Sequence, residues 1–214
     1  AYTVTRHGLS VLLPLGKLIL TAFIATVIFV VVTYLPIIKL IGMKISDYLK
    51  GAFEPWLIAF TTCSSAAALA VNLEASRKMG ASKAIASFAI PLGNTINMNG
   101  TSIYMGVTAV FAAEVFGIDL TLTQQFQIVL MGVLAAVGTA GVPGAGLIMT
   151  TLVFTEVGIP LEAVALIAGI DRILDMIRTS VNVLGDSLTA LVVSKSEGVL
   201  GTEPMDQDTI VKEV

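Results

Sequence analysis

Five polar residues near the carboxyl end of the sequence recur at a helical spacing. Asp171, Asp175, Arg178, Asn182 and Asp186 are separated by four, three, four and four positions. At about 100° per residue, these side chains fall on one narrow stripe of a helix. Arg178 offers a planar fork to a carboxylate, Asp175 can take an ammonium group, and Asp186 suits a hard cation that prefers oxygen ligands. The stripe therefore predicts a site for a zwitterion that carries an additional carboxylate.

The same stripe is compatible with two alternative roles. Asp175 and Arg178 could form a structural ion pair that joins helices, although such a pair leaves Asn182 and Asp186 unexplained. An intramembrane aspartyl protease would use two acids such as Asp171 and Asp186. Its acids would have to meet from separate helices, whereas here both lie on one.

The elements that position the stripe are predicted to be transmembrane helices. The chain is 56% hydrophobic and 13% charged, with a mean hydropathy of +0.92, whereas a soluble domain is about a quarter charged. Segments 18–38, 55–73, 84–113 and 120–155 contain no Asp, Glu, Lys or Arg. Each is long enough for a membrane-spanning helix, which needs about 20 residues. The sequence therefore predicts an all-α membrane protein and excludes a soluble enzyme.

The composition also excludes several kinds of site. The net charge of −3 provides no basic face for nucleic acid. A single Cys and a single His exclude a cysteine-based metal cluster and a multi-histidine metal site.

Two of the uncharged segments are interrupted by small and turn-forming residues. Residues 61–68 read Thr-Thr-Cys-Ser-Ser-Ala-Ala-Ala, and residues 138–146 read Gly-Thr-Ala-Gly-Val-Pro-Gly-Ala-Gly. Non-helical backbone at membrane depth occurs only where protein or water satisfies it. Paired interruptions of this kind are typical of inverted-repeat transporters, so we expect two re-entrant helical hairpins. Two kinked helices packed through small residues are the alternative.

Charges beside the two interrupted segments predict which side of the membrane each hairpin enters. The residues that flank the first segment are basic: Lys39, Lys44, Lys50, Arg77, Lys78 and Lys83. The residues that flank the second segment are acidic: Glu114, Asp119, Glu156 and Glu162. By the positive-inside rule, the first hairpin opens to the cytoplasm and the second to the outside. The predicted transport domain, residues 1–195, comprises a helix (8–42), a cytoplasmic re-entrant hairpin (45–78), a broken helix (82–116), an external re-entrant hairpin (121–156) and a substrate-binding helix (160–195). A polar cytoplasmic tail (196–214) follows this domain.

The broken helix is predicted from residues 93–101, which read Gly-Asn-Thr-Ile-Asn-Met-Asn-Gly-Thr. Asn, Gly and Thr at this density disfavour a continuous helix. An unwound turn here would expose carbonyl groups, which are the usual sodium ligands of transporters. A polar seam between two helices is the alternative interpretation.

Four motifs, in this order, resemble the dicarboxylate/amino-acid:cation symporter family, which includes the glutamate and aspartate transporters. They are Ser64-Ser65, Asn-Met-Asn-Gly-Thr at 97–101, the segment 138–146, and Asp-Met-Ile-Arg-Thr-Ser-Val-Asn-Val-Leu-Gly-Asp at 175–186. The resemblance implies the transport domain of a multi-pass cell-membrane protein, without an organic cofactor, that carries L-glutamate or L-aspartate together with sodium. It further implies a homotrimer in the full-length protein, an elevator-type movement, and scaffold helices that this sequence does not contain.

The resemblance also implies roles for individual residues. The substrate side-chain carboxylate would bind Arg178, and the substrate amino group would bind Asp175. The other residues placed at the substrate are Thr179, Asn182, Thr101, Ser64, Ser65, Gly141, Val142 and Gly144. One sodium ion would be held by Asp186 with carbonyls of Gly93, Asn97 and Asn182, and a second by Thr95 and Met98 with carbonyls of Ala136, Val137 and Thr139. Many family members have Asp in place of Asn99, so this chain lacks one carboxylate of a third sodium site.

Two further functions stay open. A C4-dicarboxylate symporter, driven by protons or sodium, would share the carboxylate-binding arginine, but a substrate without an ammonium group would leave Asp175 unpaired. A fragment that binds substrate without transporting it is the other possibility.

Overall fold

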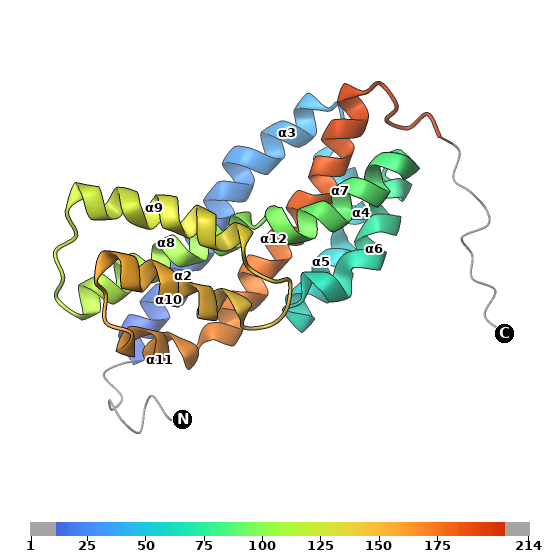
Figure 1. Cartoon of the computed structure of the whole chain (residues 1–214). Coiled ribbons are helices and arrows are strands. Elements are labelled where there is room, and N and C mark those ends of the chain that lie inside the picture. The colour runs from blue at the N-terminus through green and yellow to red at the C-terminus, as the bar shows by residue number, and fades with distance from the viewer. Residues whose placement is uncertain (1–11, 204–214) are drawn as a thin grey trace.

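The computed structural model describes residues 12–203, and within this range the chain is all-helical, as the sequence predicts (Figure 1). The helices are α2 (Leu12–Phe29), the π-helix η2 (Val30–Tyr34), α3 (Leu35–Leu40), α4 (Ile45–Gly51), α5 (Phe53–Thr62), α6 (Ser65–Lys78), α7 (Lys83–Ile96), α8 (Asn99–Val115), α9 (Leu122–Val137), α10 (Ala145–Val157), α11 (Glu162–Ala168) and α12 (Asp171–Ser196).

The first three elements, α2, η2 and α3, form one long rod. Leu13–Leu40 is apolar and long enough to cross a membrane, and it is the one helix in the described range that meets both criteria. The π-helical turn precedes Pro36, which has no N–H and crowds the carbonyl four residues earlier. The Leu35 N–H accordingly bonds to the Val30 carbonyl, five residues back. Residues 8–11 of the predicted helix lie outside the described range.

Two helical hairpins, α5–α6 and α9–α10, lie on opposite sides of α12 in Figure 1. The first turns at Cys63, whose φ of 58° is left-handed, and Ser64 then caps α6 by accepting the Ala67 N–H at 3.2 Å. The second turns within residues 138–144. The two turns meet, since the Gly141 carbonyl accepts the Ser64 hydroxyl at 2.9 Å and the Ala66 N–H at 3.2 Å.

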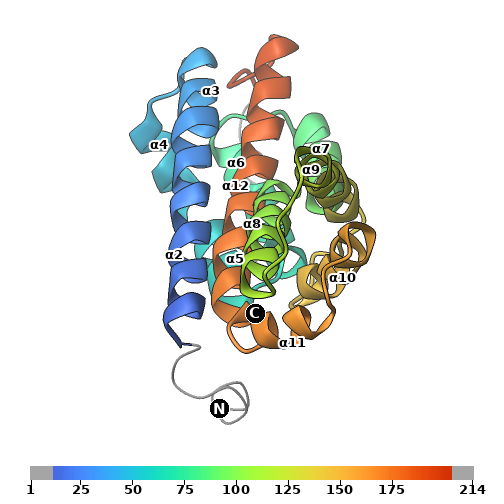
Figure 2. The same cartoon turned by 90° about the vertical axis from the view of Figure 1, so that its left-hand side faces the viewer.

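The central helix is α12, which runs through the middle of the molecule (Figure 2). Every residue from 178 to 188 is buried, so the polar stripe lies in the interior. The predicted single helix over 160–195 is wrong in one respect, because the chain bends at Gly169 and Ile170 between α11 and α12. The bend places the Asp171 carboxylate in the first turn of α12, where the helix dipole favours a negative charge.

The segment predicted as a broken helix comprises α7 and α8. Asn97 and Met98 have non-helical ψ angles of 70° and 46° between them. At the other end of α7, the Glu203 carboxylate accepts the Ser82 hydroxyl and the Lys83 N–H, both at 2.7 Å. Part of the predicted tail therefore packs on α7, while residues 204–214 of that tail lie outside the described range.

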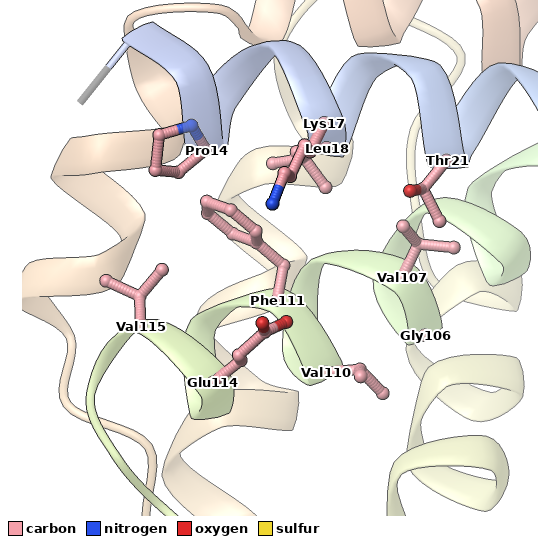
Figure 3. A pocket seen from close by; sticks show the side chains of 10 residues that line it. All are labelled: Pro14, Lys17, Leu18, Thr21, Gly106, Val107, Val110, Phe111, Glu114 and Val115. Atoms are coloured by element: carbon pink, nitrogen blue, oxygen red, sulfur yellow. The ribbon is translucent and has the colours of Figure 1, made fainter. Parts of the chain in front are cut away.

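A groove of about 520 Å³ runs between α2 and α8. Its walls are mostly apolar, with Lys17 and Glu114 extending toward it from the two helices (Figure 3). No residue of the polar stripe lines this groove. It is therefore separate from the site that the sequence predicts.

Candidate substrate and cation site

All five residues of the polar stripe are buried, although four of them carry ionisable groups. Asp171 is 7% exposed, Asp175 and Asp186 are 2% exposed, and Arg178 and Asn182 are 3% exposed. Within residues 12–203, the buried charged side chains are these three aspartates and this arginine. Their formal charges leave an excess of two negative charges in the interior.

Arg178 lies at the centre of the stripe, between two carboxylates and an aromatic ring. Its Nη2 lies 3.0 Å from Asp175 Oδ2 and its Nη1 lies 3.2 Å from Asp171 Oδ1. The guanidinium carbon lies 4.3 Å from the centroid of the Tyr104 ring, and the Tyr104 hydroxyl donates to Asp171 at 2.9 Å. Tyr104 and Asp171 thus fix the orientation of the guanidinium group.

Asp175 connects α12 to the second hairpin. Its Oδ1 accepts the Thr179 hydroxyl at 2.6 Å, and its Oδ2 accepts the Gly144 N–H at 2.9 Å as well as Arg178. A substrate ammonium group would have to approach the oxygens of this carboxylate. It would therefore compete with the contact that holds the second hairpin against α12.

Asn182 connects α12 to the start of α8. Its Oδ1 accepts the Gly100 N–H at 2.8 Å, and its Nδ2 donates to Thr101 Oγ1 at 3.0 Å and approaches Met98 Sδ at 3.2 Å. The backbones of α8 and α12 lie in close contact here, because a Cβ atom on Gly100 would collide with the Arg178 carbonyl oxygen. Glycine at position 100 therefore allows α8 to begin directly on α12.

Eight of the ten predicted substrate residues surround one cavity of about 10 Å³. They are Ser65, Thr101, Gly141, Val142, Asp175, Arg178, Thr179 and Asn182. Ser64 and Gly144 join the same cluster through their hydrogen bonds to Gly141 and Asp175. A cavity of this size holds about one water molecule, so an amino acid could enter only if a hairpin moved.

The predicted first cation site lies one turn further along α12, at Asp186. Asn97 Nδ2 donates to Asp186 Oδ1 at 2.8 Å and to the Asn182 carbonyl at 3.1 Å. Gly93 also lies against the carboxylate, since a Cβ atom at Gly93 would lie 2.6 Å from Asp186 Oδ1. The Asn97 amide nitrogen thus bridges two of the oxygens predicted to bind sodium. Backbone and carboxylate oxygens suit a hard cation, so the residues present fit sodium.

Asn99 lies next to this site. Its Nδ2 donates to Asn97 Oδ1 at 2.6 Å and to the Tyr34 hydroxyl at 3.1 Å, and Tyr34 in turn donates to the Val181 carbonyl at 3.2 Å. An amide nitrogen therefore faces the oxygen of Asn97. A cation could bind that oxygen only if the Asn99 side chain moved away.

The residues predicted for the second sodium ion are spread between α7 and the second hairpin. Met98, Ala136 and Thr139 are buried, whereas the side chains of Thr95 and Val137 are exposed. Within residues 12–203, no three His, Cys, Asp or Glu side chains form a metal-binding group. A cation at either position would therefore depend chiefly on carbonyl oxygens.

Sequence reasoning missed several residues of this cluster. Tyr34 and Tyr104 come from other helices, and no local pattern relates them to α12. Gly146 belongs to a turn motif, yet it also lies against the arginine, since a Cβ atom there would lie 2.7 Å from Arg178 Cζ.

The comparison with known proteins is decisive for the family. Residues 1–196 match the sodium:dicarboxylate symporter family. The chain belongs to this family. This membership confirms the resemblance that the four motifs indicate, and it excludes the protease interpretation, because the family consists of transporters.

Relatives of this family member transport acidic substrates. It is 39% identical over 201 residues to the proton/sodium-glutamate symport protein of Geobacillus stearothermophilus, and the match covers 94% of this chain and 48% of that protein. It is 38% identical over 197 residues to the proton/glutamate-aspartate symporter of Escherichia coli, with 92% of this chain and 45% of that protein covered. It is also 38% identical over 199 residues to the C4-dicarboxylate transport protein of Bacillus subtilis, with 92% of this chain and 47% of that protein covered. The chain therefore spans about half the length of these relatives.

Proposed function

We propose that this chain provides the substrate- and cation-binding half of a membrane symporter that carries L-glutamate or L-aspartate with sodium. The observation that carries the proposal is the buried pair Arg178–Asp175 at 3.0 Å. Arg178 suits a carboxylate and Asp175 suits an ammonium group, and both residues border the same small cavity. An acidic amino acid carries both complementary groups, so it could satisfy both residues.

Electrostatics supports coupling to a cation. The interior of the described chain already has an excess of two negative charges, and an acidic amino acid adds one more. Unbalanced charge within a membrane protein is costly, so substrate binding should require added positive charge. Sodium at Asp186, with the carbonyls of Gly93, Asn97 and Asn182, would supply it. A second ion between Thr95, Met98 and the second hairpin would offset another of these three negative charges.

The proposed mechanism begins with the second hairpin. Because Gly144 is hydrogen-bonded to Asp175, movement of this hairpin would expose Asp175 and enlarge the cavity beside it. By the charge distribution of the sequence, this hairpin enters from outside and the α5–α6 hairpin enters from the cytoplasm, where the C-terminus also lies. The whole protein would be a homotrimer, and this half would move across the membrane as an elevator-type transport domain.

A C4-dicarboxylate symporter is the second candidate, since one relative is a C4-dicarboxylate transport protein. A dicarboxylate could pair with Arg178, but it has no ammonium group for Asp175. In that case, Asp175 would keep its contacts with Thr179 and Gly144.

Isothermal titration calorimetry on the purified chain in detergent tests the proposal, with a cooperative thermal unfolding transition as the check on folding. L-Aspartate, L-glutamate and succinate are titrated in sodium buffer and in choline buffer of equal ionic strength. We expect the amino acids to bind in sodium and not in choline, and succinate to bind more weakly. Equal binding of L-aspartate in both buffers would contradict sodium coupling, and tighter binding of succinate would favour the dicarboxylate function.

A further inference from the structure

Arg172 on α12 has no role in the site described above, yet it contacts the turn of the first hairpin. Its Nη2 donates to the Thr61 carbonyl at 2.9 Å and its Nη1 donates to the Thr62 carbonyl at 3.3 Å. These carbonyls belong to the last two residues of α5. The exposed guanidinium group therefore closes the end of this helix from another part of the chain.

The chemistry of a helix end explains why this contact is favourable. The last carbonyls of a helix lack partners within the helix, and the helix dipole makes this end negative. A guanidinium group is a rigid fork of donors and can serve two neighbouring carbonyls at once. A lysine at the same position would keep the charge but lose the fork.

The next residue, Cys63, reinforces the same connection. Its thiol lies 3.8 Å from the Arg172 carbonyl oxygen, and the side chain is 1% exposed. Among the described residues, it is the one non-glycine residue with a positive φ, 58°. Such a conformation is uncommon for a residue other than Gly, Asn or Asp, so surrounding contacts must maintain it.

On its other side, the turn of the first hairpin is hydrogen-bonded to the second hairpin. Among the described residues, these hydrogen bonds reach only one atom of the second hairpin. The Gly141 carbonyl accepts both the Ser64 hydroxyl and the Ala66 N–H. Movement of the second hairpin would break both bonds together. The Arg172 contacts would then remain, because α12 does not belong to either hairpin.

We infer that Arg172 is a positioning residue that holds the turn of the first hairpin on α12 while the second hairpin opens. This inference rests on the proposed function, in which the two hairpins close opposite sides of one site. Its consequence is that only one side of the site opens at a time. We call the contacts of Arg172 with the Thr61 and Thr62 carbonyls the tether. Loss of the tether would let the first hairpin open even when the second hairpin is open.

Cys63 provides a direct measurement, because it is the only cysteine in the sequence and is buried in this turn. The purified chain is treated with N-ethylmaleimide in detergent, and labelling is followed by mass spectrometry. The variants are Arg172→Gln, Arg172→Lys and, as a matched control, Lys195→Ala, which removes an exposed positive charge from the far end of α12. Thermal unfolding is measured for each variant, and labelling is carried out well below the transition.

We expect Arg172→Gln to label about tenfold faster than the parent chain, since two hydrogen bonds from a charged donor no longer oppose local opening. Arg172→Lys should lie between the two, and Lys195→Ala should match the parent. Equal rates for the parent chain and both Arg172 variants would overturn the inference. A lower unfolding temperature with an unchanged labelling rate would show a purely structural role and would overturn it too.

Adding L-aspartate and sodium separates this inference from the proposed function. If the substrate slows labelling of the parent chain, the proposed site is supported whatever the Arg172 variants do. If it has no effect while Arg172→Gln still labels faster, the tether holds and the proposed substrate is wrong.

Discussion

Replacing Arg178 by alanine tests how the site recognises a substrate. Arg178 is 3% exposed, and its guanidinium group lies within 3.2 Å of two carboxylates. Without it, the distal carboxylate of a bound L-aspartate would be buried with no partner. Leaving a buried charge unpaired costs about 3–5 kcal/mol, which corresponds to a loss of affinity of about a hundredfold or more. L-Serine has no distal carboxylate, so its affinity should fall much less.

The assay is calorimetric titration of L-aspartate and L-serine into the parent chain, Arg178→Ala and Lys195→Ala in saturating sodium. Both variants remove one positive charge from α12, but Lys195 is exposed and distant from the cavity. The decisive quantity is the ratio of the two affinities, because any general loosening of the site acts on both ligands. A variant that unfolds cooperatively and weakens both ligands by the same factor would refute the role of Arg178 in reading the distal carboxylate.

Three further predictions concern the residues around this pair. Asn99→Asp should tighten sodium binding and steepen the dependence of L-aspartate affinity on sodium concentration, because a carboxylate would replace an amide nitrogen beside Asn97; an unchanged slope in a folded variant would mean that this position binds no cation. Gly146→Ala should weaken L-aspartate binding by about tenfold or more by displacing the guanidinium of Arg178, whereas Gly106→Ala, with no atom within 4 Å of the added Cβ, should leave the calorimetric affinity unchanged. Tyr104→Phe removes one hydrogen bond to Asp171 and should lower the free energy of unfolding by about 1 kcal/mol; an unchanged value in chemical denaturation would contradict it.

The sequence predicted the polar stripe well, because spacing along a single helix is a local property. Its five residues lie on one helix, and all five are buried. The turn-forming residues likewise marked where helices end, since Cys63 and the segment 138–144 separate the arms of the two hairpins. The placement of these hairpins in a membrane stays a prediction.

Contacts between distant segments could not be predicted from the sequence in this way. Tyr34 and Tyr104 are ordinary aromatic residues in apolar helices, and only packing brings their hydroxyl groups to Asn99 and Asp171. The helix predicted over 160–195 has no proline at its bend, and Gly169 was a weak sign of a break, because a single glycine is also tolerated inside a helix. In each case the deciding term is tertiary packing, which overrides local preference.

Under the proposed function, the hydrogen bonds of Asp175 would link recognition of the substrate to closure of the site. Its Oδ2 is shared by Arg178 and by the Gly144 N–H of the second hairpin, while its Oδ1 is held by Thr179. A ligand that supplies an ammonium could take over this carboxylate, and its own carboxylate could take over Arg178. Such an exchange would give both Asp175 and Arg178 a new ionic partner, and the second carboxylate of an acidic amino acid is the added charge that sodium would offset. A ligand that lacks the ammonium group leaves Asp175 without a new partner, and a ligand that lacks the carboxylate does the same to Arg178. We therefore expect substrate selectivity to depend on Asp175 as much as on Arg178.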